Sequence, residues 1–296
     1  MKASRGEHLF YSVNYVILSV LALSCVLPIV HLFAVSLSNN DAVTSGHVAF
    51  WPVGFTMDSY HLLIDRTPVI RAFKNSLVIT VVGTLLNMLF TIMAAYPLAR
   101  SYFYLRRFFS LAIVFTMLFN AGLIPGFLLV KSLGLIDSYA ALWLPGLVSA
   151  WNLLVLRSFF EQIPEELVDA ARIDGCGEWR LLYRVFLPLS LPVLAALSLF
   201  YGVGHWNAFF GLLIFINDAA KQNLSLLVQN MVQNQEMLQE INGQLSMSES
   251  ADMLSQITPQ SIRAAGIMVM VIPMLIVYPF LQKYFVKGML IGSIKG

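Results

Sequence analysis

Six long apolar runs constrain this chain more than any other feature of its sequence. They cover residues 12–37, 73–98, 108–130, 140–160, 187–216 and 265–285. Each is close to or above the ~20 residues that a helix needs to cross a bilayer. Only 11% of the residues are charged, well below the roughly 25% of an average soluble protein. The sequence therefore predicts an all-α polytopic membrane protein, with six transmembrane helices in a single domain over residues 1–296.

The distribution of Lys and Arg predicts the orientation of these spans. Of the 18 basic residues, 12 fall on the side that holds both termini and six on the other. Cytoplasmic segments carry the excess of positive charge, so we expect both termini and residues 161–188 in the cytoplasm. Segments 38–72 and 217–264 are then external. The first run lacks a small-residue cleavage pattern after it, and we interpret it as a retained helix rather than a secretory signal.

The net charge and the cysteines argue against a nucleic-acid partner, a disulfide and a metal site. A net charge of +2 is too small to indicate a nucleic-acid partner, and topology accounts for the positive residues. Cys25 lies in the first span and Cys176 in a cytoplasmic segment, so the two are not expected to pair, and no metal-ligand spacing is present.

The two external segments differ in character. Segment 38–72 combines prolines with aromatic residues and predicts a structured cap. Segment 217–264 is rich in Gln, Asn and Ser, but apolar residues recur at helical spacing between Leu224 and Val232. We expect a helix there, and a partly disordered loop is the alternative.

The cytoplasmic segment 161–188 carries a full set of helix signals. A proline suits the first helical position, acidic residues lie near the positive end of the helix dipole, and a glycine can take the left-handed conformation that ends a helix. The residues concerned are Pro164, Glu165, Glu166, Asp169, Ala170, Ala171, Asp174 and Gly175. Beyond them, Trp179, Leu182 and Tyr183 predict a second short apolar face. Because the two alanines are small, a partner's groove could approach this helix closely; a helix lying on lipid headgroups is the alternative.

The same segment resembles the EAA loop of ABC importer permeases. That loop reads Glu-Ala-Ala, three residues, Gly, nine residues, Ile, one residue, Leu-Pro. Asp169-Ala170-Ala171, Gly175, Val185 and Leu187-Pro188 keep every spacing, with Asp in place of Glu and Val in place of Ile. Shorter stretches at 120–125, 132–138, 144–146 and 204–207 are similar to the carbohydrate branch of these permeases (MalG-like, LplC-type). Importers of alginate or pectin oligosaccharides belong near that branch.

The resemblance implies a type I ABC importer permease fold in a bacterial cytoplasmic (inner) membrane. It implies a second homologous permease, two cytoplasmic ATPase subunits and an extracytoplasmic solute-binding protein as partners. Residues 164–174 would be the coupling helix through which ATPase closure drives alternating access. The chain has no phosphate-binding loop. ATP and Mg are therefore expected on the partner ATPases, with no cofactor on this chain and no catalysis of its own.

Polar residues inside the spans are candidates for a sugar path, because each is costly in a bilayer. They are Asn120, Asn152, His205, Trp206 and Asn207. Interhelical hydrogen bonding is the alternative role, and the second permease could make the main sugar contacts instead. No Asp or Glu lies in any predicted span, which disfavours the alternative function of a gradient-driven secondary transporter. We therefore expect a carbohydrate importer subunit, with an oligosaccharide, acidic ones included, as substrate.

Overall fold

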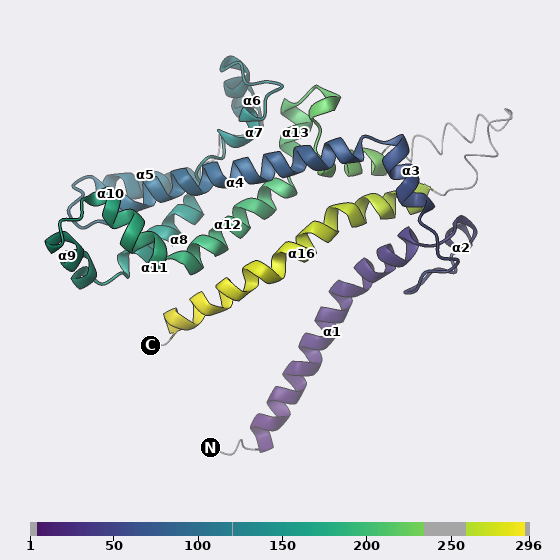
Figure 1. Cartoon of the computed structure of the whole chain (residues 1–296), viewed down its shortest axis with the longest axis horizontal. Coiled ribbons are helices and arrows are strands. Elements are labelled where there is room, and N and C mark those ends of the chain that lie inside the picture. The colour runs from purple at the N-terminus through teal and green to yellow at the C-terminus, as the bar shows by residue number, and fades with distance from the viewer. Residues whose placement is uncertain (1–4, 120, 234–258, 294–296) are drawn as a thin grey trace. The chain divides into compact units, whose positions relative to one another are not determined.

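The computed structural model describes residues 5–119, 121–233 and 259–293, and these residues form helices joined by short loops (Figure 1). The chain divides into two compact units. The first unit comprises Met1–Val69 and Val228–Ile272, and the second comprises Ile70–Leu227 and Pro273–Gly296. The path candidate Asn120 and most of the second external segment, 234–258, lie outside the described residues.

The first unit contains α1 (Arg5–Ser36), α2 (Asn40–Thr44), α3 (Asp58–Arg66) and the first part of α16 (Pro259–Ser293). The segment 38–72 is therefore structured, as its composition predicts. Asn39 caps α2, since its side chain accepts a hydrogen bond from the Ala42 amide at 3.0 Å. Gly54 adopts φ +63°, and a side chain there would meet Asn39 at 2.6 Å. Small residues of α1, α2 and α16 make the core of this unit.

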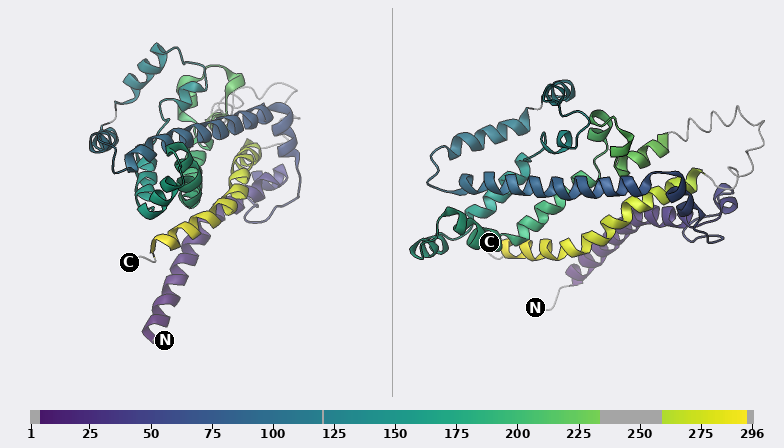
Figure 2. Two further views of the ribbon diagram at one scale, coloured as in Figure 1. Left: turned by 60° about the vertical axis from the view of Figure 1, so that its left-hand side comes forward. Right: turned by 45° about the horizontal axis from the view of Figure 1, so that its top comes forward.

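The second unit contains most of the remaining helices. They are α4 (Val69–Ala99), α5 (Arg106–Leu118), α6 (Leu123–Ser132), α7 (Ala140–Trp143), α8 (Ala150–Glu161), α9 (Glu165–Ile173), α10 (Glu178–Leu181), the π-helix η1 (Leu182–Phe186), α11 (Leu187–Leu189), α12 (Leu191–Trp206), α13 (Phe210–Phe215) and the 3-10 helix η2 (Ala219–Lys221). Helix α8 contacts both α5 and α12, and Figure 2 shows the same ribbon from two further directions. Residues 224–233 are helical, which confirms the helix expected from their apolar spacing.

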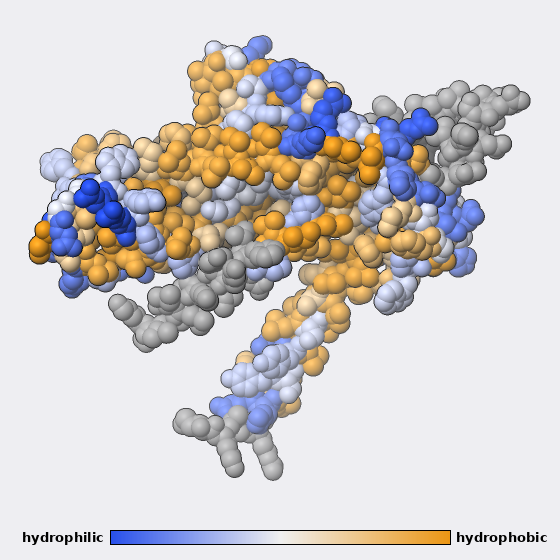
Figure 3. Space-filling view, in the orientation of Figure 1, coloured by the Kyte–Doolittle hydropathy of each residue, from blue (hydrophilic) through white to orange (hydrophobic). Residues whose placement is uncertain are grey.

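Three helices are long and apolar enough to cross a membrane in the described part of the chain: Gly6–Ser36, Val69–Ala99 and Gln260–Pro279. They coincide with the first, second and sixth predicted spans. Two bent helix pairs, α5 with α6 and α10–α11 with α12, raise the number to as many as five. The fourth predicted span, 140–160, is divided by a loop into α7 and the 12-residue α8. Apolar side chains cover much of the visible face of α4, while polar ones gather at the end that carries α9 (Figure 3).

Candidate functional site

Helix α9 lies where the sequence places the coupling helix. It begins at Glu165, with Pro164 in the capping position one residue earlier, and Glu165 and Glu166 occupy its first turn. The predicted start therefore agrees to within one residue, the usual ambiguity of helix ends. The two carboxylates stand beside the unpaired amides of the first turn, where negative charge is stabilised by the helix dipole.

The end of α9 is a Schellman motif built around Gly175. This glycine has φ +74°, its amide donates to the Arg172 carbonyl at 2.9 Å, and the Cys176 amide donates to the Ala171 carbonyl at 3.0 Å. These are the two bonds that define the motif. The structure thus confirms that Gly175 ends the helix by adopting the left-handed conformation.

A single buried residue holds α9 to the rest of the second unit. Val168 is 2% exposed and is the only buried side chain of the helix, while Ala171 packs partly against the same apolar cluster. The opposite face is open: Ile173 is 87% exposed and Leu167 46%. The other predicted coupling residues on this exposed surface are Pro164, Glu165, Glu166, Asp169, Ala170 and Asp174. The helix therefore presents apolar and acidic groups outward, with two small alanines along it.

The segment after α9 differs from its prediction. Trp179 and Tyr183 are each 74% exposed, whereas Leu182 is 7% exposed, so these three residues do not share a face. The buried side chains are instead Leu181, Leu182 and Phe186. The side of this segment that faces the core is centred between Leu181 and Leu182, so Trp179 and Tyr183 fall outside it; residues Leu182–Phe186 themselves form a π-helix.

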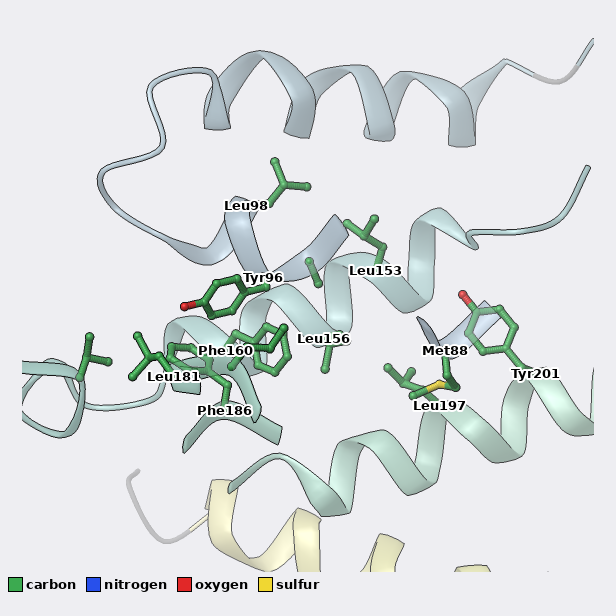
Figure 4. Close-up of a cluster of buried hydrophobic side chains, with 13 residues drawn as sticks. Met88, Tyr96, Leu98, Leu153, Leu156, Phe160, Leu181, Phe186, Leu197 and Tyr201 are labelled. Carbon is green, nitrogen blue, oxygen red and sulfur yellow. The ribbon is translucent and has the colours of Figure 1, made fainter. Parts of the chain in front are cut away.

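The buried side chains of α9, α10 and η1 join a cluster that includes residues of α4, α8 and α12 (Figure 4). At its centre are three aromatic rings in edge-to-face contact. The Tyr96 ring lies 5.0 Å from Phe186 and 6.4 Å from Phe160, and the latter two lie 5.4 Å apart. Such geometry is favoured by the ring quadrupoles. Through this cluster, the candidate coupling segment is packed against the end of α4.

Glu178 makes the polar contacts of this region. The Tyr96 hydroxyl donates to Glu178 Oε2 at 2.5 Å, and Arg172 Nη2 lies 3.2 Å from Glu178 Oε1. Burial alone would raise the pKa of the Glu178 carboxyl, but hydrogen bonds from Tyr96, Tyr102 and Arg172 together outweigh burial and hold that pKa below its usual value. The carboxylate is therefore charged at neutral pH, with a partner on each oxygen.

Two arginines surround Glu178 and its tyrosine partners. The Arg100 guanidinium lies 5.9 Å from the ring centre of Tyr96 and 5.4 Å from that of Tyr102, and the Arg172 guanidinium lies 5.5 Å from Tyr102. These are cation–π distances. Sequence reasoning missed this group, because it used Arg100 only to predict topology. The pairing of Arg100 with the nearby Tyr102 at the end of a span was the available signal.

The described path candidates fall into two groups. Trp206 is 4% exposed and meets the Phe73 ring edge-on at 5.9 Å, and Asn152 is 6% exposed. His205 is partly buried and Asn207 exposed. His205 Nε2 lies 2.5 Å from Asn87 Oδ1, and Asn87 Nδ2 donates to the Gly146 carbonyl at 2.7 Å. In this conformation the polar atoms of His205 and Asn87 therefore bond α12 to α4 and to the loop before α8.

A second polar cluster joins two loops that the sequence predicts to be external. Asp137 has φ +62°, and its Oδ1 accepts hydrogen bonds from the amides of Asp218 at 3.0 Å and Asn217 at 3.2 Å. Lys221 Nζ lies 3.1 Å from Asp137 Oδ2. The bond from the Asp218 amide and the one from Lys221 lower the pKa of Asp137. Sequence reasoning did not predict these contacts, which join residues 80 or more positions apart.

Comparison with known proteins identifies the family. Residues 76–291 match the model of the binding-protein-dependent transport system inner membrane component. The chain belongs to this family. It is a permease subunit, and its membrane is the inner membrane named in the family description. The helical architecture predicted from the apolar runs and the EAA-like loop is that of an ABC importer permease, as the next comparison confirms.

Similar proteins extend the match over the whole permease. This chain is 40% identical to the polygalacturonan/rhamnogalacturonan transport system permease protein YtcP of Bacillus subtilis (strain 168), over 98% of this chain and 99% of the relative. It is 38% identical to Protein LplC of the same organism, over 100% and 98% of the two chains. A chain from the crystal structure of a bacterial ABC transporter involved in the import of the acidic polysaccharide alginate superposes with a TM-score of 0.85, at 30% identity, over 96% of this chain and 99% of that one.

Proposed function

We propose that this permease imports an oligosaccharide, of the acidic class found in pectin and alginate. The observation that carries the proposal is the match in both sequence and fold to proteins whose names state such transport. The similarity to the polygalacturonan/rhamnogalacturonan permease covers 98% of the chain at 40% identity. The alginate transporter chain shares 30% identity with a TM-score of 0.85. The proposed substrate class thus rests on two similar proteins whose names refer to the transport of uronate-containing polymers.

In this proposal α9 docks into a cytoplasmic ATPase and is the coupling helix. Its open face supports this role, because Ile173 is 87% exposed and the small Ala170 is exposed between acidic neighbours. An exposed apolar side chain beside small residues is suited to a protein groove, and the flanking carboxylates can fix its register through charge pairing. Asp169 holds the place of the glutamate in the EAA pattern, so its carboxylate is the proposed ion-pair partner of a basic ATPase residue.

The remaining parts of the importer follow from the same proposal. A second permease of the same type, two ATPase subunits that bind ATP and Mg, and an extracytoplasmic solute-binding protein complete the assembly. Both termini of this chain lie in the cytoplasm, as the twofold excess of Lys and Arg on that side indicates. Closure of the ATPases around ATP pushes α9 and shifts the permease pair between inward-facing and outward-facing states.

The sugar path stays a proposal for Asn152, His205, Trp206, Asn207 and Asn120. Asn207 is exposed at the end of α12 and offers a polar group to a sugar ring. Trp206 beside it is buried against Phe73 in this conformation and presents no open ring face. The bonding of His205 to Asn87 supports a role for His205 in holding α12 to α4. Selection for an acidic sugar then depends on the binding protein and the second permease as well.

The first experiment tests coupling. The complete transporter, purified through this chain and placed in lipid nanodiscs, is assayed for ATP hydrolysis with and without its binding protein. We expect Asp169→Lys and Gly175→Pro to abolish the stimulated hydrolysis, since one reverses the docking charge and the other removes the left-handed end of α9. Asp65→Lys and Gly134→Pro are the matched controls outside the coupling segment. Purification of the permease without any ATPase, or equal losses in the controls, would contradict the proposal.

The second experiment tests the substrate class. Binding of trigalacturonate, of an alginate trisaccharide and of neutral arabinotriose to the solute-binding protein is measured by calorimetry, and uptake of each is followed in proteoliposomes. We expect the two uronate sugars to be taken up with ATP consumption and arabinotriose to be excluded. Uptake of arabinotriose alone would leave the importer assignment intact but overturn the acidic class. Uptake driven by an ion gradient without ATP would favour a secondary transporter.

A further inference from the structure

Besides the short chain link from α8 into α9, the coupling segment is joined to the membrane helices by two connections of different construction. The first connection follows the chain from α10 through η1 and α11 into α12. It bends by 82° at Ser190, where the backbone leaves helical geometry with φ −98° and ψ 7°. Pro188 and Pro192 on either side donate no amide hydrogen bond. Two helical hydrogen bonds are therefore missing at this connection, although the Ser190 amide still donates to the Phe186 carbonyl at 3.0 Å. The angle of α12 is thus less restrained here than within a continuous helix.

The second connection runs through side chains from α10 to α4. The Tyr96 hydroxyl bonds Glu178 at 2.5 Å, and the Tyr96 ring, 9% exposed, is packed against Phe186 and Phe160 in the aromatic cluster (Figure 4). A ring in edge-to-face contact with two other rings and fixed at its tip by a charged hydrogen bond has little freedom to slide or rotate. This connection is accordingly rigid.

Glu178 also fixes α9 to the same point. Its second carboxylate oxygen pairs with Arg172, one residue before the end of α9, at 3.2 Å. Val168 and Ala171 pack against the cluster that contains Tyr96. A displacement of α9 therefore reaches α4 through both packing and an ion pair, without passing the bend at Ser190.

We infer that Tyr96 and Glu178 form a rigid joint that makes α9 and α4 move together when the ATPases close, while α12 pivots at Ser190. Both are positioning residues, since they act through the coupling helix rather than on substrate. The inference rests on the proposed function and adds the route by which the movement enters the membrane. It assigns α4 as the helix that follows the ATPase and α12 as the one that changes its angle to α4. The hydrogen bonds that join α12 to α4 in this conformation, between Tyr201 and Thr91 and between His205 and Asn87, must then open during the movement.

The test measures distances in the complete transporter by pulsed electron paramagnetic resonance. After Cys25 and Cys176 are replaced by serine, spin labels are placed on Arg180→Cys in the coupling segment and on either Leu85→Cys in α4 or Phe200→Cys in α12. Both of the latter positions are exposed, at 65% and 51%. Between the nucleotide-free state and the state trapped with ATP and vanadate, we expect the 180–85 distance to stay constant and the 180–200 distance to change.

Two conservative variants then test the joint itself. Tyr96→Phe keeps the ring packing and removes the hydroxyl, and Glu178→Gln keeps the shape and removes the charge. In each, the 180–85 distance should become sensitive to nucleotide, and stimulation of ATP hydrolysis by the trigalacturonate-loaded binding protein should fall roughly 3- to 10-fold, within the range for residues that couple two sites. The double variant should lose no more than the stronger single one, because both act on one bond. Tyr139→Phe, which removes a hydroxyl bonded to the Lys221 carbonyl at 3.0 Å, is the matched control and should change neither quantity.

The outcomes separate this inference from the proposed function. If the 180–85 and 180–200 distances change equally with nucleotide in the transporter that keeps Tyr96 and Glu178, the rigid joint is refuted and the importer function stands. The same conclusion follows if Tyr96→Phe and Glu178→Gln leave the 180–85 distance constant, or if Tyr139→Phe lowers the stimulation as much as they do. If no ATPase purifies with the chain and neither distance responds to nucleotide, the proposed function itself fails, and the inference with it.

Discussion

Replacement of Val168 by alanine should loosen α9 from the permease without disturbing its outer surface. Val168 is the only buried side chain of the helix, at 2% exposure. The change removes two carbon atoms from the core, each worth about 0.8 kcal/mol when buried, and it leaves a small cavity that adds to the cost. Together these give about 1.5–3 kcal/mol for the local opening of α9.

Hydrogen–deuterium exchange measures that opening directly. Because about 1.4 kcal/mol corresponds to a tenfold change in an equilibrium constant, the amides of residues 168–173 should exchange about 10- to 100-fold faster in Val168→Ala. Leu167→Ala is the matched control, since Leu167 is 46% exposed and contributes far less packing. An increase below twofold in Val168→Ala, or an equal increase in Leu167→Ala, would show that Val168 does not anchor α9 and refute the reasoning.

Three further predictions concern single contacts. The depressed pKa of Glu178 means that the hydrogen bonds it accepts from Tyr96, Tyr102 and Arg172 stabilise the fold above the unfolded carboxyl pKa and are lost as pH falls through the lower folded value. Thermal unfolding of the purified complex should lose stability below about pH 4, and Glu178→Gln should remove the contribution of this group. In Gly175→Ala the new methyl meets no atom within 4 Å, but the residue must adopt φ +74°, so the free energy of unfolding should fall by about 1–2 kcal/mol. The control Gly126→Ala, within a helix, should be neutral or stabilising in the same unfolding assay. Gly83→Ala would place its methyl 2.6 Å from the His205 ring and break the bond between His205 and Asn87, which should lower the free energy of unfolding by about 1 kcal/mol. The loss should shrink when His205→Ala is also present. An undiminished loss would argue against this contact as its cause.

The sequence determined the parts of the structure that depend on local patterns. Apolar length predicted α1, α4 and α16, because a helix that faces lipid must be apolar along its whole span. The position of α9 was predicted within one residue at its start, and Gly175 as its end, because caps and helix stops are properties of a few neighbouring residues. The spacing of the EAA-like loop also pointed to the family, which the match over residues 76–291 confirms.

Tertiary structure decided the features that arise between distant residues or from departures from ideal helices. The 82° bend at Ser190 divides an apolar run that reads as one span, since hydropathy records composition but not where the backbone ladder breaks. The core faces Leu181 and Leu182 and leaves Trp179 exposed, because the packing partners, and not the apolar spacing alone, decide which side of a short helix is buried. The bond between Tyr96 and Glu178 joins residues 82 positions apart. Such a contact depends on how α4 and α10 pack, and only folding brings the two residues within hydrogen-bond distance.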